Sequence, residues 1–243
     1  MIFKEAINSY KENISTAFAF ALLLVFVLPF VWLSNSFISS ASVLIDYGFL
    51  KQPLIDSIFL LIFTLLFLFC YSLLICLMVF SVRKDMSNVK VQHFLNEKII
   101  KHTFKYFRFL TIFTLIAAIV SSVLIEVGVS VEIINLILFV VSSLFLFLAQ
   151  TIVVDEESLR SSIVSNLDFI FNNFSNFLKV MLFGIISVFV LQIFEFVIDY
   201  FFLVGNFLSL IIALVFLVPF IETLKTRIYM KRFDIIKHYN SSK

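Results

Sequence analysis

Three polar side chains in an otherwise apolar segment have a spacing that could support ion or proton transfer. Gln192, Glu195 and Asp199 stand at positions i, i+3 and i+7, on one face of a helix. A carboxylate in hydrocarbon is costly and commonly marks an ion or proton path. The sequence offers this face as a candidate transport or proton site, which Glu126 and Glu132 would extend. The alternative is that Asp199, Glu126 and Glu132 are solvated at the membrane surface, while Glu195 is protonated or hydrogen-bonded to a neighbouring helix.

A second set of charges lies where the last apolar segment ends. Glu222 stands three residues before Lys225, so the two side chains share a helix face. Arg83, which follows another apolar segment, could reach Glu222 across a bundle. We predict a structural ion pair of Glu222 with one of these two bases.

Small residues recur four apart in the third apolar segment. Ala117 and Ser121 form one such pair, and Ala118 and Ser122 form another. Small residues at this spacing let helix backbones approach closely in membranes. We expect them to pack against the fourth apolar segment, with a homodimer interface as the alternative.

Catalytic and metal-binding patterns are missing from the sequence. His93, His102 and His238 have no partner at ligand spacing, and Cys70 and Cys76 lie six apart within one apolar run. No nucleophile motif or glycine-rich phosphate loop occurs. We therefore expect no enzyme activity, metal or cofactor. The small net charge of +2 and the scattered basic residues argue against nucleic-acid binding.

The elements that must position these residues are membrane helices. The chain of 243 residues is 62% hydrophobic and 14% charged, with a mean hydropathy of +1.11, whereas soluble domains are about 25% charged. Apolar runs of about 18 residues or more indicate spanning helices. We predict an all-α polytopic bundle forming a single membrane domain, 1–243. Its six transmembrane helices are expected at about 14–36, 53–82, 107–125, 133–154, 177–203 and 207–229.

The basic residues predict the orientation of this bundle. Of 18 Lys and Arg residues, 17 fall on one side of the predicted spans, and only Lys51 falls on the other. Basic residues accumulate on the cytoplasmic side of membrane proteins. We expect a cell-membrane protein with both termini in the cytoplasm.

Short polar segments between the spans have helical periodicity of their own. Segments 89–100 and 155–174 each place apolar residues on one face, as does the N-terminal segment. We predict amphipathic interfacial helices there on the cytoplasmic side, the second capped by Asp155. Gly205 and Asn206 are expected to form a tight turn, with Gly205 at positive φ and Asn206 as an N-cap.

The second half of the chain also resembles a known group of proteins. The matching features are a valine-rich span end running into an acidic dipeptide, an amphipathic helix, and a proline-containing last helix that ends on tyrosine and basic residues. They correspond to Val153, Val154, Asp155, Glu156, Pro219, Tyr229 and Arg232. This pattern resembles six-pass prokaryotic membrane proteins related to the membrane domain attached to some glycerophosphoryl diester phosphodiesterases. The resemblance covers 151–234 and implies a fold but no activity.

Taken together, these patterns favour a membrane protein without a catalytic site. We expect a scaffold, an accessory subunit or a lipid-interacting protein, with membrane lipids as partners and other membrane subunits or a second copy as further candidates. The alternative is a small transporter or channel that uses the polar face around Glu195.

Overall fold

The computed structural model describes residues 2–27, 37–39, 42–44, 54–87, 95–202 and 204–233. In this part of the chain all regular structure is helical except for one short hairpin, in which β1 (Phe37–Ser39) pairs antiparallel with β2 (Ser42–Leu44). The helical elements are α1 (Ile2–Glu12), α2 (Ile14–Phe18), η1 (Ala19–Leu22), α4 (Leu54–Ser87), α5 (Leu95–Glu126), α6 (Val131–Ser143), α7 (Leu148–Val154), α8 (Leu159–Asn172), α9 (Phe174–Phe202), α10 (Gly205–Ile212), η3 (Ala213–Leu217), α11 (Val218–Met230) and η4 (Lys231–Phe233). The predicted all-α class is confirmed.

The long apolar helices identify a multi-pass membrane protein. Five segments are long and apolar enough to cross a bilayer: Ile58–Met86, Lys98–Glu126, Val131–Val154, Phe174–Phe202 and Gly205–Met230. Ile2–Glu12 and Ile14–Val27, which meet at an angle of 77°, give a sixth if the pair counts as one span. These segments overlap the predicted spans, although the segment at the third span begins at Lys98, nine residues before the predicted start at 107. Residues 28–36 of the first predicted span and Pro53 lie outside the described residues.

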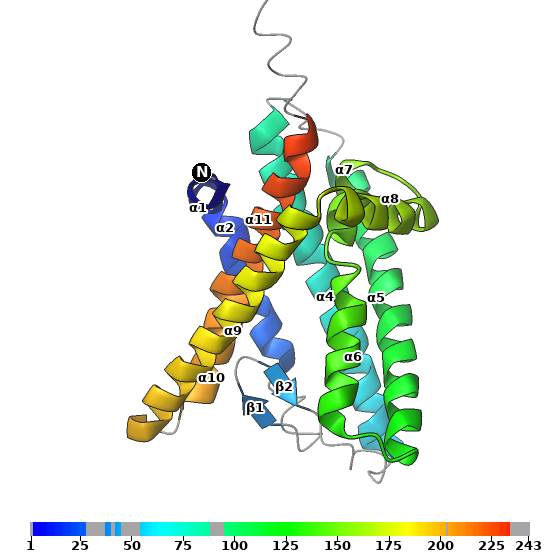
Figure 1. Cartoon of the computed structure of the whole chain (residues 1–243), viewed down its shortest axis with the longest axis vertical. Helices are drawn as coiled ribbons and strands as arrows, with labels where there is room; N and C mark the ends of the chain where they lie inside the picture. Colours follow the sequence, from blue (N-terminus) through cyan, green and yellow to red (C-terminus); the bar gives the residue numbers. More distant parts are fainter. Residues whose placement is uncertain are drawn as a thin grey trace, which may run out of the picture.

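The bundle has two arms that meet at one end (Figure 1). α4, α5 and α6 form one arm, and α9, α10 and α11 form the other, with α2 beside η3. α4 packs against α5, α7 and α11, so it links the arms. α1, the short helices α7 and α8, and the end of α11 all lie where the arms meet. This end includes Arg83, Lys105 and Arg227, and we call it the basic end.

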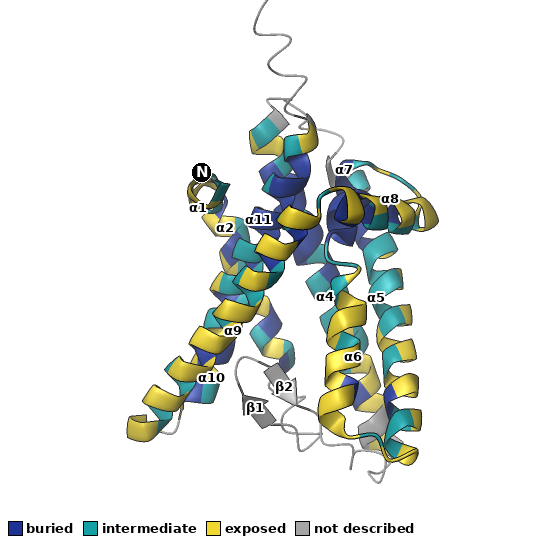
Figure 2. Ribbon diagram, in the orientation of Figure 1, coloured by how far each residue is buried: buried dark blue, intermediate teal, exposed yellow. Residues whose placement is uncertain are grey.

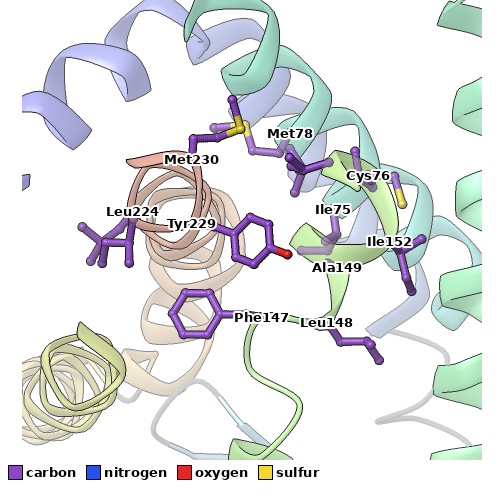
Figure 3. Close-up of a cluster of buried hydrophobic side chains, with 14 of the residues drawn as sticks. Ile75, Cys76, Met78, Phe147, Leu148, Ala149, Ile152, Leu224, Tyr229 and Met230 are labelled. Carbon is purple, nitrogen blue, oxygen red and sulfur yellow. The ribbon is translucent and has the colours of Figure 1, made fainter. Parts of the chain in front are cut away.

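Most buried residues of the described chain gather at the basic end, whereas the arms are largely exposed (Figure 2). Tyr229 of α11 is fully buried and extends toward α7, with Phe147 beside it (Figure 3). The Tyr229 ring centroid lies 4.6 Å from that of Phe169, which in turn lies 4.9 Å from that of Phe147. In a bilayer helices are held by such packing contacts, because lipid is as apolar as the core. The basic end is therefore the most tightly packed part of the described bundle.

The fourth predicted span is two helices joined by a break. α6 ends at Ser143 and α7 begins at Leu148. The amides of residues 144–146 bond to carbonyls three residues before them, such as Phe145 N to Ser142 O at 3.0 Å. Asn166 of α8 hydrogen-bonds two backbone groups that have lost their helical partners at the break. Its side-chain oxygen accepts from Phe147 N at 3.0 Å, and its amide nitrogen donates to Leu144 O at 2.6 Å. Backbone groups at membrane depth require such partners.

The last span contains a wide π-helical turn, η3, which ends two residues before Pro219. Proline has no N–H, and its ring collides with the carbonyl four residues earlier in a regular helix. A turn with one extra residue relieves that collision, as π-bulges do elsewhere. Thr223 Oγ1 donates to the Pro219 carbonyl at 2.8 Å. The span therefore stays continuous across the proline.

The N-terminal segment forms the predicted helix, α1, which turns into the first span at Asn13. The Asn13 amide donates to Ser9 O at 2.8 Å and to the Asp85 carboxylate at 2.5 Å, and its oxygen accepts from Ser81. The bend is thereby tied to the end of α4. The 77° angle between Ile2–Glu12 and Ile14–Val27 is therefore held at Asn13.

Two interfacial helices differ from the sequence predictions. Segment 89–100 does not form a separate helix over its described part, because Leu95 already begins α5, which continues without a break to Glu126. Residues 88–94 lie outside the described residues. The segment after α7 does contain a helix, α8, but its N-cap is Ser158, whose side chain accepts from Ser161 N. Asp155 is not the cap, because its carboxylate instead contacts Tyr229 and Arg232.

Candidate functional site

The predicted polar face of α9 is divided between two environments. Glu195 accepts a hydrogen bond from Ser209 Oγ at 2.9 Å, and Asp199 accepts one from Gly205 N at 2.6 Å. Both donors belong to α10, so the two carboxylates fasten α9 to the helix that follows it. This geometry agrees with the hydrogen-bonded alternative for Glu195. Asp199 differs from the alternative of a solvated carboxylate, because it accepts from the Gly205 amide. Gln192 lies outside these contacts.

Gly205 permits the close approach of α10 to α9 because it has no side chain, and not through a positive φ as the sequence suggested. It is the first residue of α10, and its φ is not positive. A Cβ at this position would lie 2.5 Å from Glu195 O and 2.9 Å from Asp199 Oδ1. Gly205 is therefore needed for space, and the predicted left-handed turn is wrong. Asn206 Oδ1 accepts from the next amide, Phe207 N, at 2.8 Å.

The acidic residues of the other outer turn do not join this face. Glu126 ends α5 and Glu132 lies in the first turn of α6, on the arm opposite α9 and α10 (Figure 1). The turn between them has Gly128 at φ +86°, as a tight connection of two helices requires. The structure therefore does not gather an acidic cluster from the two arms.

Gln192 instead lines an apolar cavity of about 610 Å³ between the arms. Its lining comes from Phe139 and Leu146 on one arm and from α9, η3 and α11 on the other. The cavity falls within the range of about 300–1,000 Å³ that is typical of small-molecule sites. Several lining side chains, including Ile185 and Phe189, are exposed. The cavity is therefore open to the surrounding lipid.

The lining of this cavity has one polar side chain among the described residues, that of Gln192. Gln192 is exposed and has no hydrogen-bond partner within the described parts of the chain. Gly184 also lines the cavity, two helical turns from Gln192, and a Cβ added there would meet nothing within 4 Å. The cavity therefore has room for a side chain at position 184.

Charged residues gather at the basic end, where they connect helices. Lys225 Nζ lies 2.6 Å from Glu222 Oε1, and both side chains are almost fully buried. Gln150 of α7 donates to the other carboxylate oxygen of Glu222 at 3.0 Å. The predicted pair of Glu222 with Lys225 is present. Arg83 does not join it, because its guanidinium lies at the end of α7.

The connector between α7 and α8 is anchored through two of its three acidic residues, Asp155 and Glu156. Asp155 accepts from Tyr229 Oη at 2.5 Å and forms an ion pair with Arg232. The Arg232 guanidinium carbon lies 4.0 Å from the centre of the Tyr229 ring, a cation–π arrangement. Three residues that carried the family resemblance are thus in direct contact, and they join the connector to the end of α11.

Glu156 connects the same segment to the other arm. Its carboxylate lies 2.8 Å from Lys98 Nζ and 3.2 Å from Arg83 Nη1. The hydrogen bond from Lys98, with that from Arg83, lowers the pKa of Glu156 below its ordinary value. Arg83 also donates to Val153 O at 2.8 Å, at the C-terminal end of α7. Glu156 has φ +59°, a conformation that few residues other than glycine adopt.

The predicted small-residue stripe is only partly buried. Ser121 is buried, whereas Ala118 is exposed, and Ser122 donates to its own helix at Ala118 O. α5 does pack against α6, but more extensively against α4. The four residues therefore do not form one continuous interface within the described chain.

Sequence reasoning missed Gln150 and Asn166, which are both fully buried. Each lies in a stretch whose polar residues look like a solvated face or a helix end. It also treated Gln192 as one of three equivalent polar residues. A glutamine two turns from a glycine on one helix face was the available signal, but the sequence does not show that a second arm stands opposite that face.

A metal centre does not form among the described residues, where no group of three or more His, Cys, Asp or Glu side chains could hold an ion. Comparisons with known proteins add no identity: no protein family model, curated protein or solved structure matches this chain.

Proposed function

We propose that this chain is a lipid-interacting membrane protein that binds an apolar chain of a membrane lipid between its two arms. The observation that carries the proposal is the lipid-facing cavity of about 610 Å³ lined by α6, α9, η3 and α11. A cavity within a membrane span is filled from the bilayer, and its apolar lining suits a hydrocarbon chain. Binding rather than catalysis is then the role of the site.

The proposal includes a place in the cell. Because basic residues accumulate on the cytoplasmic side, the basic end faces the cytoplasm of a prokaryotic cell and both termini lie there. The basic end would also attract anionic lipid by about 1 kcal/mol per Lys or Arg near the surface. A scaffold or accessory role is compatible with lipid binding, since the connector and α8 present a folded surface there.

A transport role draws less support from the same geometry. Its two carboxylates, Glu195 and Asp199, are engaged by Ser209 and Gly205 of α10. A proton or ion carrier needs groups that can release those contacts. Unchanged proteoliposome flux in Glu195→Gln would count against the transport role.

The test fills the cavity without disturbing the packing around it. Gly184→Phe places a ring into open space, because nothing lies within 4 Å of its Cβ position. Val190→Phe adds the same ring at an exposed position of α9 outside the cavity lining. The protein is reconstituted with a phospholipid that carries a photoreactive diazirine in its acyl chain, and labelled peptides are identified by mass spectrometry.

We expect labelling at Ile185 and Val188 in the parent chain. Gly184→Phe should lower it at least threefold, and Val190→Phe should leave it within experimental error. Equal labelling in the two variants would show that the cavity does not hold a lipid chain.

A further inference from the structure

Gln192 is the feature of the cavity that a plain hydrocarbon chain does not explain. Its side-chain amide carries two N–H donors and an acceptor oxygen, and none of them has a partner within the described chain. Gln192 lies four residues past the midpoint of Phe174–Phe202, about 6 Å along the helix axis. The amide therefore lies deep in the hydrocarbon, where an unmet polar group is unfavourable.

The position of this amide indicates a ligand that reaches it through the cavity. Gln192 follows Val188 by one helical turn and Gly184 by two, so the three line the same wall, and all three are lining residues. A molecule lying in the cavity would pass Gly184 and Val188 and could end at the amide. A single polar group in an apolar site commonly fixes the orientation of its ligand.

The surroundings restrict the charge of that ligand. No charged side chain lines the cavity among the described residues. Glu195 stands one turn beyond Gln192 and accepts from Ser209. Lys225 lies one turn beyond Ile221 on α11 but is paired with Glu222 at 2.6 Å. A charged headgroup at Gln192 would lie in hydrocarbon without a counter-charge. A neutral carbonyl or hydroxyl group meets the amide without that cost.

We propose that the cavity selects a neutral lipid whose carbonyl or hydroxyl group hydrogen-bonds the side-chain amide of Gln192. This inference rests on the proposed function, because it names the class of lipid that the same cavity holds. Diacylglycerol is a suitable probe, since it is uncharged and bears both ester carbonyls and a hydroxyl. A second copy of the chain, pairing through the amides of two Gln192 residues, is the other occupant that a test must separate.

The experiment compares three photoreactive probes that carry the same diazirine: a diacylglycerol, a phosphatidylcholine with identical chains, and a long-chain alkane. The full chain is reconstituted in nanodiscs, and labelling at Ile185 and Val188 is measured for the parent, Gln192→Leu and Gly184→Phe. Gln192→Leu removes the amide at an exposed position, so we expect it to fold as the parent does. Native mass spectrometry of the same samples reports the number of copies per nanodisc.

The neutral probe should label the parent at least threefold more than phosphatidylcholine, and Gln192→Leu should abolish that preference. Alkane labelling should be unchanged in Gln192→Leu and reduced in Gly184→Phe. Loss of alkane labelling only in Gly184→Phe, with no diacylglycerol preference in the parent, would refute the inference and leave the proposed function standing. A parent dimer that Gln192→Leu converts to monomer would also refute it, because the amide would then be satisfied by a second copy.

Discussion

Asn166 is the residue on which the shape of the fourth span depends. Its one side chain meets both a freed N–H, at Phe147, and a freed C=O, at Leu144. Asparagine suits this position, because a side-chain amide carries N–H donors and an acceptor oxygen side by side. The break in turn lets α7 stand fully buried between α4, α8 and α11.

We expect Asn166→Leu to destabilise the protein by about 2–4 kcal/mol, because the buried N–H of Phe147 and the partly buried C=O of Leu144 both lose their partner. A fully buried group without a partner costs about 1–3 kcal/mol, and the partly buried carbonyl costs less. Asn172→Leu, on the exposed side of the same helix, is the matched control and should change stability little. The free energy of unfolding in mixed detergent micelles measures both. Similar values for the two variants would mean that water or a rearranged turn replaces the Asn166 amide.

At this scale the sequence is least informative. Asn166 lies in a polar segment after a span, where asparagine is ordinary, and its partner at Leu144 is 22 residues away. The ion pair of Glu222 with Lys225 could be predicted because both residues lie on one helix three apart. The hydrogen bond between Tyr229 and Asp155 could not be predicted, because it depends on how α11 packs against the connector between α7 and α8.

At the scale of elements, the hairpin of α9 and α10 shows how one glycine sets a helix–helix distance. The place that a Cβ of Gly205 would take lies 2.5 Å from Glu195 O, which is backbone and cannot move aside. Gly184, on the same hairpin, has open space around it. Position 205 therefore excludes a larger residue and position 184 accepts one, a difference that the sequence does not show.

Gly205→Ala should cost about 1–3 kcal/mol of stability through overpacking. Gly184→Ala should be neutral or stabilising by up to about 1 kcal/mol, because alanine is the better helix former. Both changes add one methyl group, so their difference in unfolding free energy isolates the close approach. A Gly205→Ala variant as stable as the parent would contradict the described contact between α9 and α10.

The spans themselves were predictable because a bilayer requires long apolar helices. The breaks and wide turns within these helices were harder to predict. The wide turn at Ala213–Leu217 could be anticipated only from Pro219, and the gap between α6 and α7 only from the amide of Asn166. Segment 89–100 was predicted as a surface helix because its apolar residues fall on one helical face. Over its described part, from Leu95, it instead belongs to the continuous helix α5, which packs along α4.

At the scale of the whole molecule, the two arms share a common base and separate away from it. Buried aromatic rings and ion pairs lie mainly at the basic end, where α4, α7, α8 and α11 meet. Helices in lipid gain no hydrophobic free energy by closing together, so the sequence could not indicate whether the arms touch along their length. Their separation creates the cavity that carries the proposed function.

The orientation of this assembly in the membrane gives the last prediction. Val127 is 75% exposed at the turn between α5 and α6, at the opposite end from the basic end. Arg160 is exposed on α8 at the basic end. With basic residues inside, Val127→Cys in intact cells should react with a membrane-impermeant maleimide, and Arg160→Cys should react only after permeabilisation.

The parent chain supplies the background for this measurement, because both of its cysteines lie within α4 and Cys76 is buried. Labelling of the parent should therefore be low under either condition. If Arg160→Cys reacted in intact cells and Val127→Cys did not, the basic end would face outward, and charge would not govern the insertion of this protein. If both reacted in intact cells, the segment Val131–Val154 between the two positions would not cross the bilayer, and the cavity between the arms would lose its lipid surroundings.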